Sequence, residues 1–210
     1  EVLITGNAKG AQKAFGDLEK SAGKSGKKAE SSLSKLNSSL IGFGVGAAVY
    51  GAFSAFDDAQ KVMAQTDAVI KSTGASANVT AGEVEDLASA LSKKTGIDDE
   101  AIQSGENLLL TFTNIRNEVG EGNDIFDQAT VAALDMSVAL GTDMTSASTT
   151  LGKALNDPVA GMSKLTKIGV TFTAQQKAQV KALAESGDRL GAQKIILAEL
   201  NKEFGGSAEA

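Results

Sequence analysis

One glycine-lysine motif near the start of the chain has the spacing of a nucleotide-binding element. Gly23-Lys24-Ser25 matches the end of a phosphate-binding loop, but such a loop also requires a glycine five residues before the Gly-Lys pair. That position is Leu18, and no strand-like run comes directly before the motif. We therefore do not expect this chain to bind a nucleotide.

Two serine-lysine pairs have the Ser-x-x-Lys spacing of some acylating enzymes. They are Ser21 with Lys24 and Ser32 with Lys35. In such enzymes a pocket lowers the pKa of the lysine, so that its amine can activate the serine. Both pairs lie in a polar, lysine-rich segment that offers no such pocket, and we interpret the spacing as coincidence.

Acidic side chains form one cluster, Asp98-Asp99-Glu100, which together with Glu106 could bind a hard cation. The alternating acidic ligands and central glycine of a calcium loop are missing. Acidic residues in the first turn of a helix complement the helix dipole, and this explains the cluster without a metal. Any two acids could converge in space as a glycoside-cleaving pair, and nothing in the sequence marks one.

The chain contains no histidine and no cysteine. Histidine is the most common general base and metal ligand, and cysteine supplies thiol nucleophiles, thiolate ligands and disulfides. Most hydrolase active sites are therefore excluded. We expect a protein that is not an enzyme and has no cofactor and no metal site.

Charge is unevenly distributed along the 210 residues. The net charge of −6 divides into +3 for residues 1–40, −11 for 41–150 and +2 for 151–210. The acidic middle would repel nucleic acid, so we expect no sequence-specific nucleic-acid binding. Hydrophobic residues make up 42% of the chain and aromatic residues only 4%, which favours closely packed helices over large pockets.

Residues 8–40 have a single narrow apolar stripe at helical spacing. Its members, three, four or seven residues apart, are Phe15, Leu18, Ala22, Ala29, Leu33, Leu36 and Leu40. A stripe of this width suits packing against another copy, as in a coiled coil, and predicts a homo-oligomer. The alternative is a solvated helix that docks only on its own domain.

Residues 36–56 carry no charge over 21 positions, a length that could span a bilayer. Gly42, Gly46, Ala47 and Gly51 are small residues at about one-turn spacing, which lets helices approach closely. We interpret the segment as the buried seam of a helical bundle. The alternative function is that of a membrane-active helical protein that inserts this segment as a pore or channel for DNA.

The second half of the chain is rich in signals that begin and end helices. Thr80 with Glu83 and Thr173 with Gln176 have the spacing of capping boxes. Further expected caps are Asp98, Asp143 (or Thr142), Asp157 before Pro158, and Asp188, and the expected terminators are Gly96, Gly141, Gly169, Gly187 and Gly205-Gly206. The helix after Asp98 is expected to reach about Ile115, and the next is expected over 124–140.

These signals predict an all-α protein with a long N-terminal helical arm followed by a compact multi-helix domain. We expect a short strand or extended lead over 1–7, the arm over 8–72 and a hinge loop over 73–79. A compact domain of about six short helices follows over 80–206. Residues 207–210 are expected to start a linker to a further C-terminal part.

The order of these signals from Lys153 to Ala208 resembles the conserved region of phage tail tape-measure proteins, of which the chain looks like an N-terminal portion. The matching residues are Leu155, Asp157-Pro158, Leu165, Gly169-Val170, Phe172-Thr173, Gln176-Lys177, Leu183, Gly187-Asp188, Ala192-Gln193, Ile196-Leu197, Leu200, Phe204-Gly205-Gly206 and Ala208. Each residue alone is a helix cap or a core position. The ordered set over about 55 residues is what resembles the family.

The resemblance implies a structural protein that sets tail tube length during assembly and takes part in genome ejection. It implies a location in the lumen of the tail tube in the virion, and in the host cytoplasm during assembly. The implied partners are the tail tube protein, tail assembly chaperones and tail tip proteins, with host membrane contact at ejection. Because residues 80–206 are interrupted so often, we expect this portion to serve self-association and docking, with the measuring rod elsewhere.

Overall fold

The computed structural model describes the backbone of residues 46–210 and the side chains from Ala59 onward. The chain divides into two compact units, Glu1–Phe56 and Asp57–Ala210. Of the first unit, the described residues comprise only the start of helix α3. The predicted lead 1–7 and most of the predicted arm lie outside the described residues.

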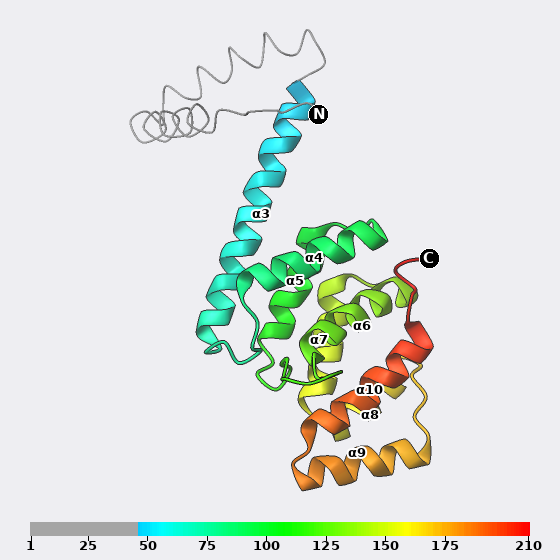
Figure 1. Cartoon of the computed structure of the whole chain (residues 1–210). Coiled ribbons are helices and arrows are strands. Elements are labelled where there is room, and N and C mark those ends of the chain that lie inside the picture. The colour runs from blue at the N-terminus through cyan, green and yellow to red at the C-terminus, as the bar shows by residue number, and fades with distance from the viewer. Residues whose placement is uncertain (1–45) are drawn as a thin grey trace, which may run out of the picture. The chain divides into compact units, whose positions relative to one another are not determined.

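Every regular element in the described part is a helix (Figure 1). The helices are α3 (Gly46–Ser72), α4 (Ala81–Thr95), α5 (Asp99–Leu110), α6 (Ile125–Leu140), α7 (Met144–Asn156), α8 (Pro158–Thr166), α9 (Ala174–Ser186) and α10 (Arg189–Phe204). Within residues 46–210 the only β-type pairing is an isolated bridge between Asn117 and Asp124. The all-α prediction is confirmed, with seven helices over 80–206 where about six were expected.

The predicted caps decide where these helices begin and end. Thr80 with Glu83 and Thr173 with Gln176 form complete capping boxes. Each threonine hydroxyl accepts the backbone N–H of its partner, and each threonine backbone N–H donates to the partner's side-chain oxygen. The side chains of the predicted aspartate caps accept backbone N–H groups at the starts of α5, α7, α8 and α10. Gly96, Gly141 and Gly187 end their helices in the left-handed conformation, which glycine adopts without strain.

Helix α5 ends at Leu110, five residues before the expected end near Ile115. Helical periodicity continues through Phe112 in the sequence, but the ring of Phe112 packs directly over Gly152 of α7. Ile115 is fully buried after the chain has turned out of the helix. Tertiary packing therefore overrides the local pattern at this point.

The core of the second unit lies among α5, α6, α7 and α10. Its largest fully buried side chains include Ile102, Phe126, Leu151 and Ile196. Helix α5 packs on α4, α6 and α7, and α10 packs on α6, α8 and α9. A side chain at Gly152 would overlap Phe112, and one at Gly161 would overlap the backbone of Ala154. Glycine at these two positions is therefore what allows the close approach of α7 to its neighbours.

The C-terminal part of α3 belongs to this same unit. The buried Thr66 hydroxyl accepts a hydrogen bond from Gln103 Nε2 of α5 at 3.0 Å. The Val62 carbonyl accepts one from Asn107 Nδ2 at 3.3 Å. In the connection over 73–79, Ala77 is buried. The second unit, Asp57–Ala210, therefore includes the C-terminal part of α3.

Candidate functional site

The predicted site residues lie at the start of the chain. The self-association stripe, Phe15, Leu18, Ala22, Ala29, Leu33, Leu36 and Leu40, lies outside the described residues, as does Gly42. Gly46, Ala47 and Gly51 lie in the backbone of α3, before the range in which side chains are described. The two Ser-x-x-Lys pairs and the Gly-Lys-Ser motif also lie outside. No helix within residues 46–210 combines the length and apolarity that a membrane crossing requires.

The acidic cluster at the start of α5 is brought together as its sequence suggests. Carboxylate oxygens of Asp98, Asp99 and Glu100 lie within 4.8 Å of one another. Asp98 uses its carboxylate to accept the Ala101 N–H at 3.1 Å. Glu106 is not part of this group. The cluster therefore acts as the cap and first turn of α5.

Glu106 instead lies in the interior, at 0% exposure and without a hydrogen-bond partner for either carboxylate oxygen. Burial, with a smaller contribution from the charge of Asp127, raises the pKa of Glu106 to about 9. The side chain is therefore protonated at neutral pH. Burial also raises the pKa of Asp127, against the opposing effect of the hydrogen bond from Asn117.

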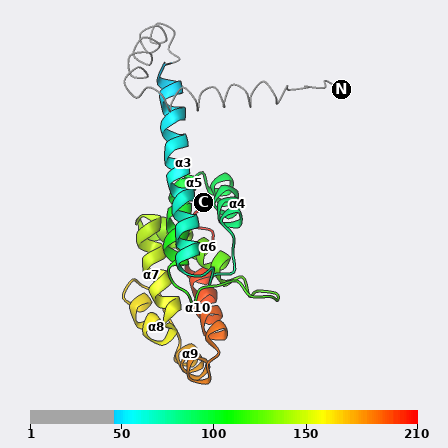
Figure 2. The same cartoon turned by 90° about the vertical axis from the view of Figure 1, so that its left-hand side faces the viewer.

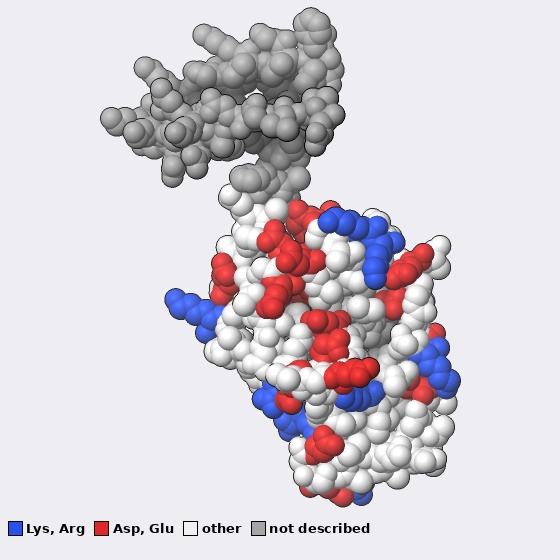
Figure 3. Space-filling model, in the orientation of Figure 1, with Lys and Arg blue, Asp and Glu red and all other residues white. Residues whose placement is uncertain are grey.

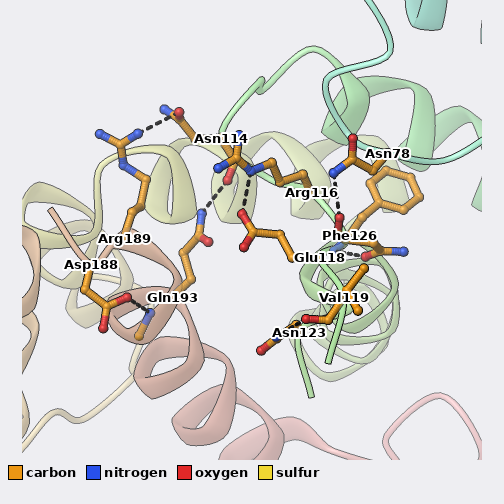
Figure 4. A network of polar contacts seen from close by, with 12 residues as sticks. Asn78, Asn114, Arg116, Glu118, Val119, Asn123, Phe126, Asp188, Arg189 and Gln193 are labelled. Atoms are coloured by element: carbon orange, nitrogen blue, oxygen red, sulfur yellow. Dashed lines mark hydrogen bonds and ion pairs between the residues drawn. The ribbon is translucent and has the colours of Figure 1, made fainter. Parts of the chain in front are cut away.

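A network of side-chain hydrogen bonds supports the 14-residue connection between α5 and α6, residues 111–124 (Figure 4). Asn114 lies at its base and contacts two other helices. Its Nδ2 donates to Asn156 Oδ1 at 2.8 Å, and its Oδ1 accepts from Arg189 Nη1 at 2.6 Å. Gln193 Nε2 donates both to the Asn114 carbonyl at 2.8 Å and to the Leu155 carbonyl at 3.0 Å.

Asn117 fixes the middle of this connection and caps α6. Asp124 precedes α6 but makes no side-chain cap. Asn117 Oδ1 accepts the Phe126 N–H at 2.9 Å in its place, and Asn117 Nδ2 donates to Asp127 Oδ1 at 2.8 Å. The backbone N–H of Asn117 donates to the Ala77 carbonyl at 2.9 Å, so the loops before α4 and α6 are joined.

The outer part of the connection, residues 118–123, forms a narrow turn that we call the finger loop. The Glu118 N–H donates to the Asn123 carbonyl at 2.9 Å, and Asn123 Nδ2 donates to the Val119 carbonyl at 2.8 Å. Lys194 Nζ of α10 donates to Asn123 Oδ1 at 2.6 Å. Val119 is 101% exposed. Figure 2 shows this connection extending away from the helices.

Three surface grooves lie between helices of the unit. One, of about 440 Å³, separates α8 from α9 and is lined by Val159, Met162, Ser163, Thr166, Lys177 and Lys181. A second, of about 450 Å³, lies among α3, α5 and α7, and a third, of about 390 Å³, lies between α6 and α10. All three are open, and none contains the buried Glu106. Figure 3 shows a band of acidic side chains across one face of the unit.

Comparison with known proteins decides the family. A family model described as prophage tail length tape measure protein matches residues 10–181. The chain belongs to this family. No curated protein and no solved structure matches it.

The tape-measure family is one of structural phage tail proteins, not of enzymes, and its members act in determining tail length. Its match covers the predicted arm and most of the compact unit. The residues from Leu183 to Ala208 that resemble tape-measure proteins lie beyond the matched range.

Two residues beyond the matched range, Gln193 and Gly206, make contacts in this tape-measure protein that the sequence did not predict. Gln193 joins α10 to the Asn114 and Leu155 carbonyls, as described above. Gly206, at φ +80°, turns the chain so that its N–H and that of Ala208 point at Asp135 of α6. Those N–H groups donate to the two Asp135 carboxylate oxygens at 3.2 and 2.9 Å. The only sequence signal for these contacts is a polar residue within an apolar helical stripe.

Proposed function

We propose that this chain contributes to tail length determination as the assembly and docking module of its tape-measure protein. Residues 8–72 associate with other copies through the Phe15–Leu40 stripe. The compact unit docks to tail components, and the distance that fixes tube length is measured elsewhere in the protein. The observation that carries this proposal is that a chain matching the tape-measure family folds into short helices that pack on one another.

The dimensions of the helices support this division. A helix advances about 1.5 Å per residue, so the 27 residues of α3 extend about 40 Å. The seven helices that follow have only 9 to 16 residues each, and they pack on their neighbours. Such an arrangement suits a unit that presents surfaces to partners.

The partners that fit this role are other copies of the chain, the tail tube protein, tail assembly chaperones and tail tip proteins. We place the protein in the lumen of the tail tube in the virion and in the host cytoplasm during assembly. Participation in genome ejection is part of the same proposal, since a protein in the lumen must leave the tube before DNA can pass.

An insertion experiment tests whether the compact unit is excluded from the measurement. A helix-forming segment of about 40 residues, inserted between Gly187 and Asp188, keeps both helix caps at this exposed corner. Tails of phage carrying the insertion are expected to keep their length in electron micrographs. If the unit is part of the ruler, tails should lengthen, by about 60 Å for a helical insert.

A further inference from the structure

The finger loop presents an apolar side chain in a way that suits insertion into a partner. Val119 at its tip is fully exposed, and the exposed Glu121 lies two residues further on. Glu118, on the other side of Val119, is already paired with Arg116, whose Nε lies 2.8 Å from its carboxylate. The hydrogen bonds of Asn117 and Asn123 hold the backbone on either side. A loop that is already ordered loses little conformational entropy when it binds.

The groove between α8 and α9 is lined by apolar and basic side chains, which complement the apolar and acidic side chains of the finger loop. Val159, 40% exposed, and the buried Met162 supply apolar surface from one face of α8. Lys177 and Lys181 lie on one face of α9 at the opposite wall. Lys181 Nζ is 3.8 Å from Glu185 within α9, and both side chains are about two-thirds exposed. Such an exposed pair is weak and leaves the lysine available to another carboxylate.

We propose that the finger loop of one copy inserts into the α8–α9 groove of a neighbouring copy. Val119 contacts Val159 and Met162, and Glu121 faces Lys177 and Lys181. A loop cannot reach the groove of its own chain, because the finger loop and α8 lie on opposite sides of the unit (Figure 2). The contact therefore joins two different surfaces of two copies, and repeating it closes a ring or extends a filament.

The contact is small beside the area that a stable protein interface requires, about 800 Å² per partner. It acts when copies are already held together, because tethering raises the effective concentration of loop and groove. In this respect it rests on the proposed self-association through the arm. Its geometry and charge pattern are independent of the arm.

Cysteine cross-linking in the full chain tests the contact, since the natural chain has no cysteine. Val119→Cys and Val159→Cys chains are prepared separately, mixed and oxidised, and the linked peptides are identified by mass spectrometry. The matched control replaces Val159→Cys by Val138→Cys, a valine of similar exposure, 45%, on α6. We expect the 119–159 disulfide to exceed the 119–138 disulfide at least about ten-fold, because disulfides require Cβ atoms about 4 Å apart. Equal yields would overturn the proposal.

Charge reversal provides a second, independent measurement. Glu121→Lys places a positive charge opposite Lys177 and should lower the 119–159 yield about two- to five-fold, the effect expected of an exposed ion pair. Adding Lys177→Glu to the partner chain should restore it. Loss without restoration, or no loss, counts against this pairing of loop and groove.

The arm variant Leu33→Asp with Leu36→Asp separates this contact from the proposed arm association. In that background the 119–159 disulfide should still form in preference to the 119–138 disulfide, although the total yield is lower. This result supports the loop contact whatever light scattering shows for the arm. Loss of the preference in a wild-type arm background, where the chain is still oligomeric, overturns the loop contact and leaves the arm proposal standing.

Discussion

At the scale of single residues, the most informative group is the buried Glu106. Its pKa is raised from 4.5 to about 9 because no partner compensates for its burial. Between these values the unfolded chain has an ionised carboxylate and the folded chain a neutral one. The unfolded state therefore binds fewer protons, and the free energy of unfolding falls as pH rises from about 4.5 to about 9.

Replacing Glu106→Gln should remove this pH dependence. Each pH unit in the window accounts for about 1.4 kcal/mol, which amounts to about 3 kcal/mol at pH 7. Urea unfolding of the variant between pH 5 and 8 is expected to show a shallower loss of stability than the wild type. The exposed Glu85→Gln serves as the control and should retain the wild-type slope. Parallel profiles for wild type and Glu106→Gln would show that the carboxyl is not buried in neutral form.

Asn117 shows a second effect that belongs to one residue. Its amide takes over the cap that Asp124 does not provide, and it also holds Asp127. Asn117→Ala should cost about 1–3 kcal/mol, because it removes two side-chain hydrogen bonds at the start of a core helix. Amide hydrogen exchange over 118–124 is expected to accelerate as well. Glu121→Gln, near the tip of the finger loop, should change neither the stability nor the hydrogen exchange. An equal effect of both variants would contradict the role of Asn117 in holding the connection and capping α6.

At the scale of elements, helix ends were predictable because their causes are local. Thr80 with Glu83, and Asp157 before Pro158, place donor and acceptor within three residues of each other, so spacing alone determines the bond. The end of α5 was predicted wrongly because it depends on Phe112 meeting Gly152, which lies 40 positions later in the chain. The hydrogen bonds that Asn114, Asp135 and Gln193 make to distant parts of the chain were not predicted, for the same reason.

Substitution of two helical glycines tests how closely the helices pack. Gly161→Ala in α8 should destabilise the unit, because its Cβ would overlap the Ala154 backbone, which cannot move as a flexible side chain can. We expect a loss of about 1–3 kcal/mol, the usual cost of overpacking. Gly82→Ala in α4 faces open space and should be neutral or stabilise by up to about 1 kcal/mol. Thermal unfolding of both variants checks the pair, and equal shifts would contradict the close approach of α7 and α8.

At the scale of the whole molecule, the sequence predicted the fold class and the family, and the family match confirms the latter. Its prediction of function depended on an ordered set of caps and core positions, since no reactive group marks a site. The division into arm, hinge and domain remains a prediction, as does the role of the stripe. Local patterns suggest both but do not decide them, because both depend on which surfaces meet in an assembly.

The self-association of the arm is the central claim, and the mass of the full chain in solution tests it most directly. Light scattering should give a multiple of 21.4 kDa for the wild type and 21.4 kDa for Leu33→Asp with Leu36→Asp. The variant should keep the helical circular dichroism and melting transition of the compact unit. A wild-type chain that is already monomeric, or a variant whose mass is unchanged, would contradict the account.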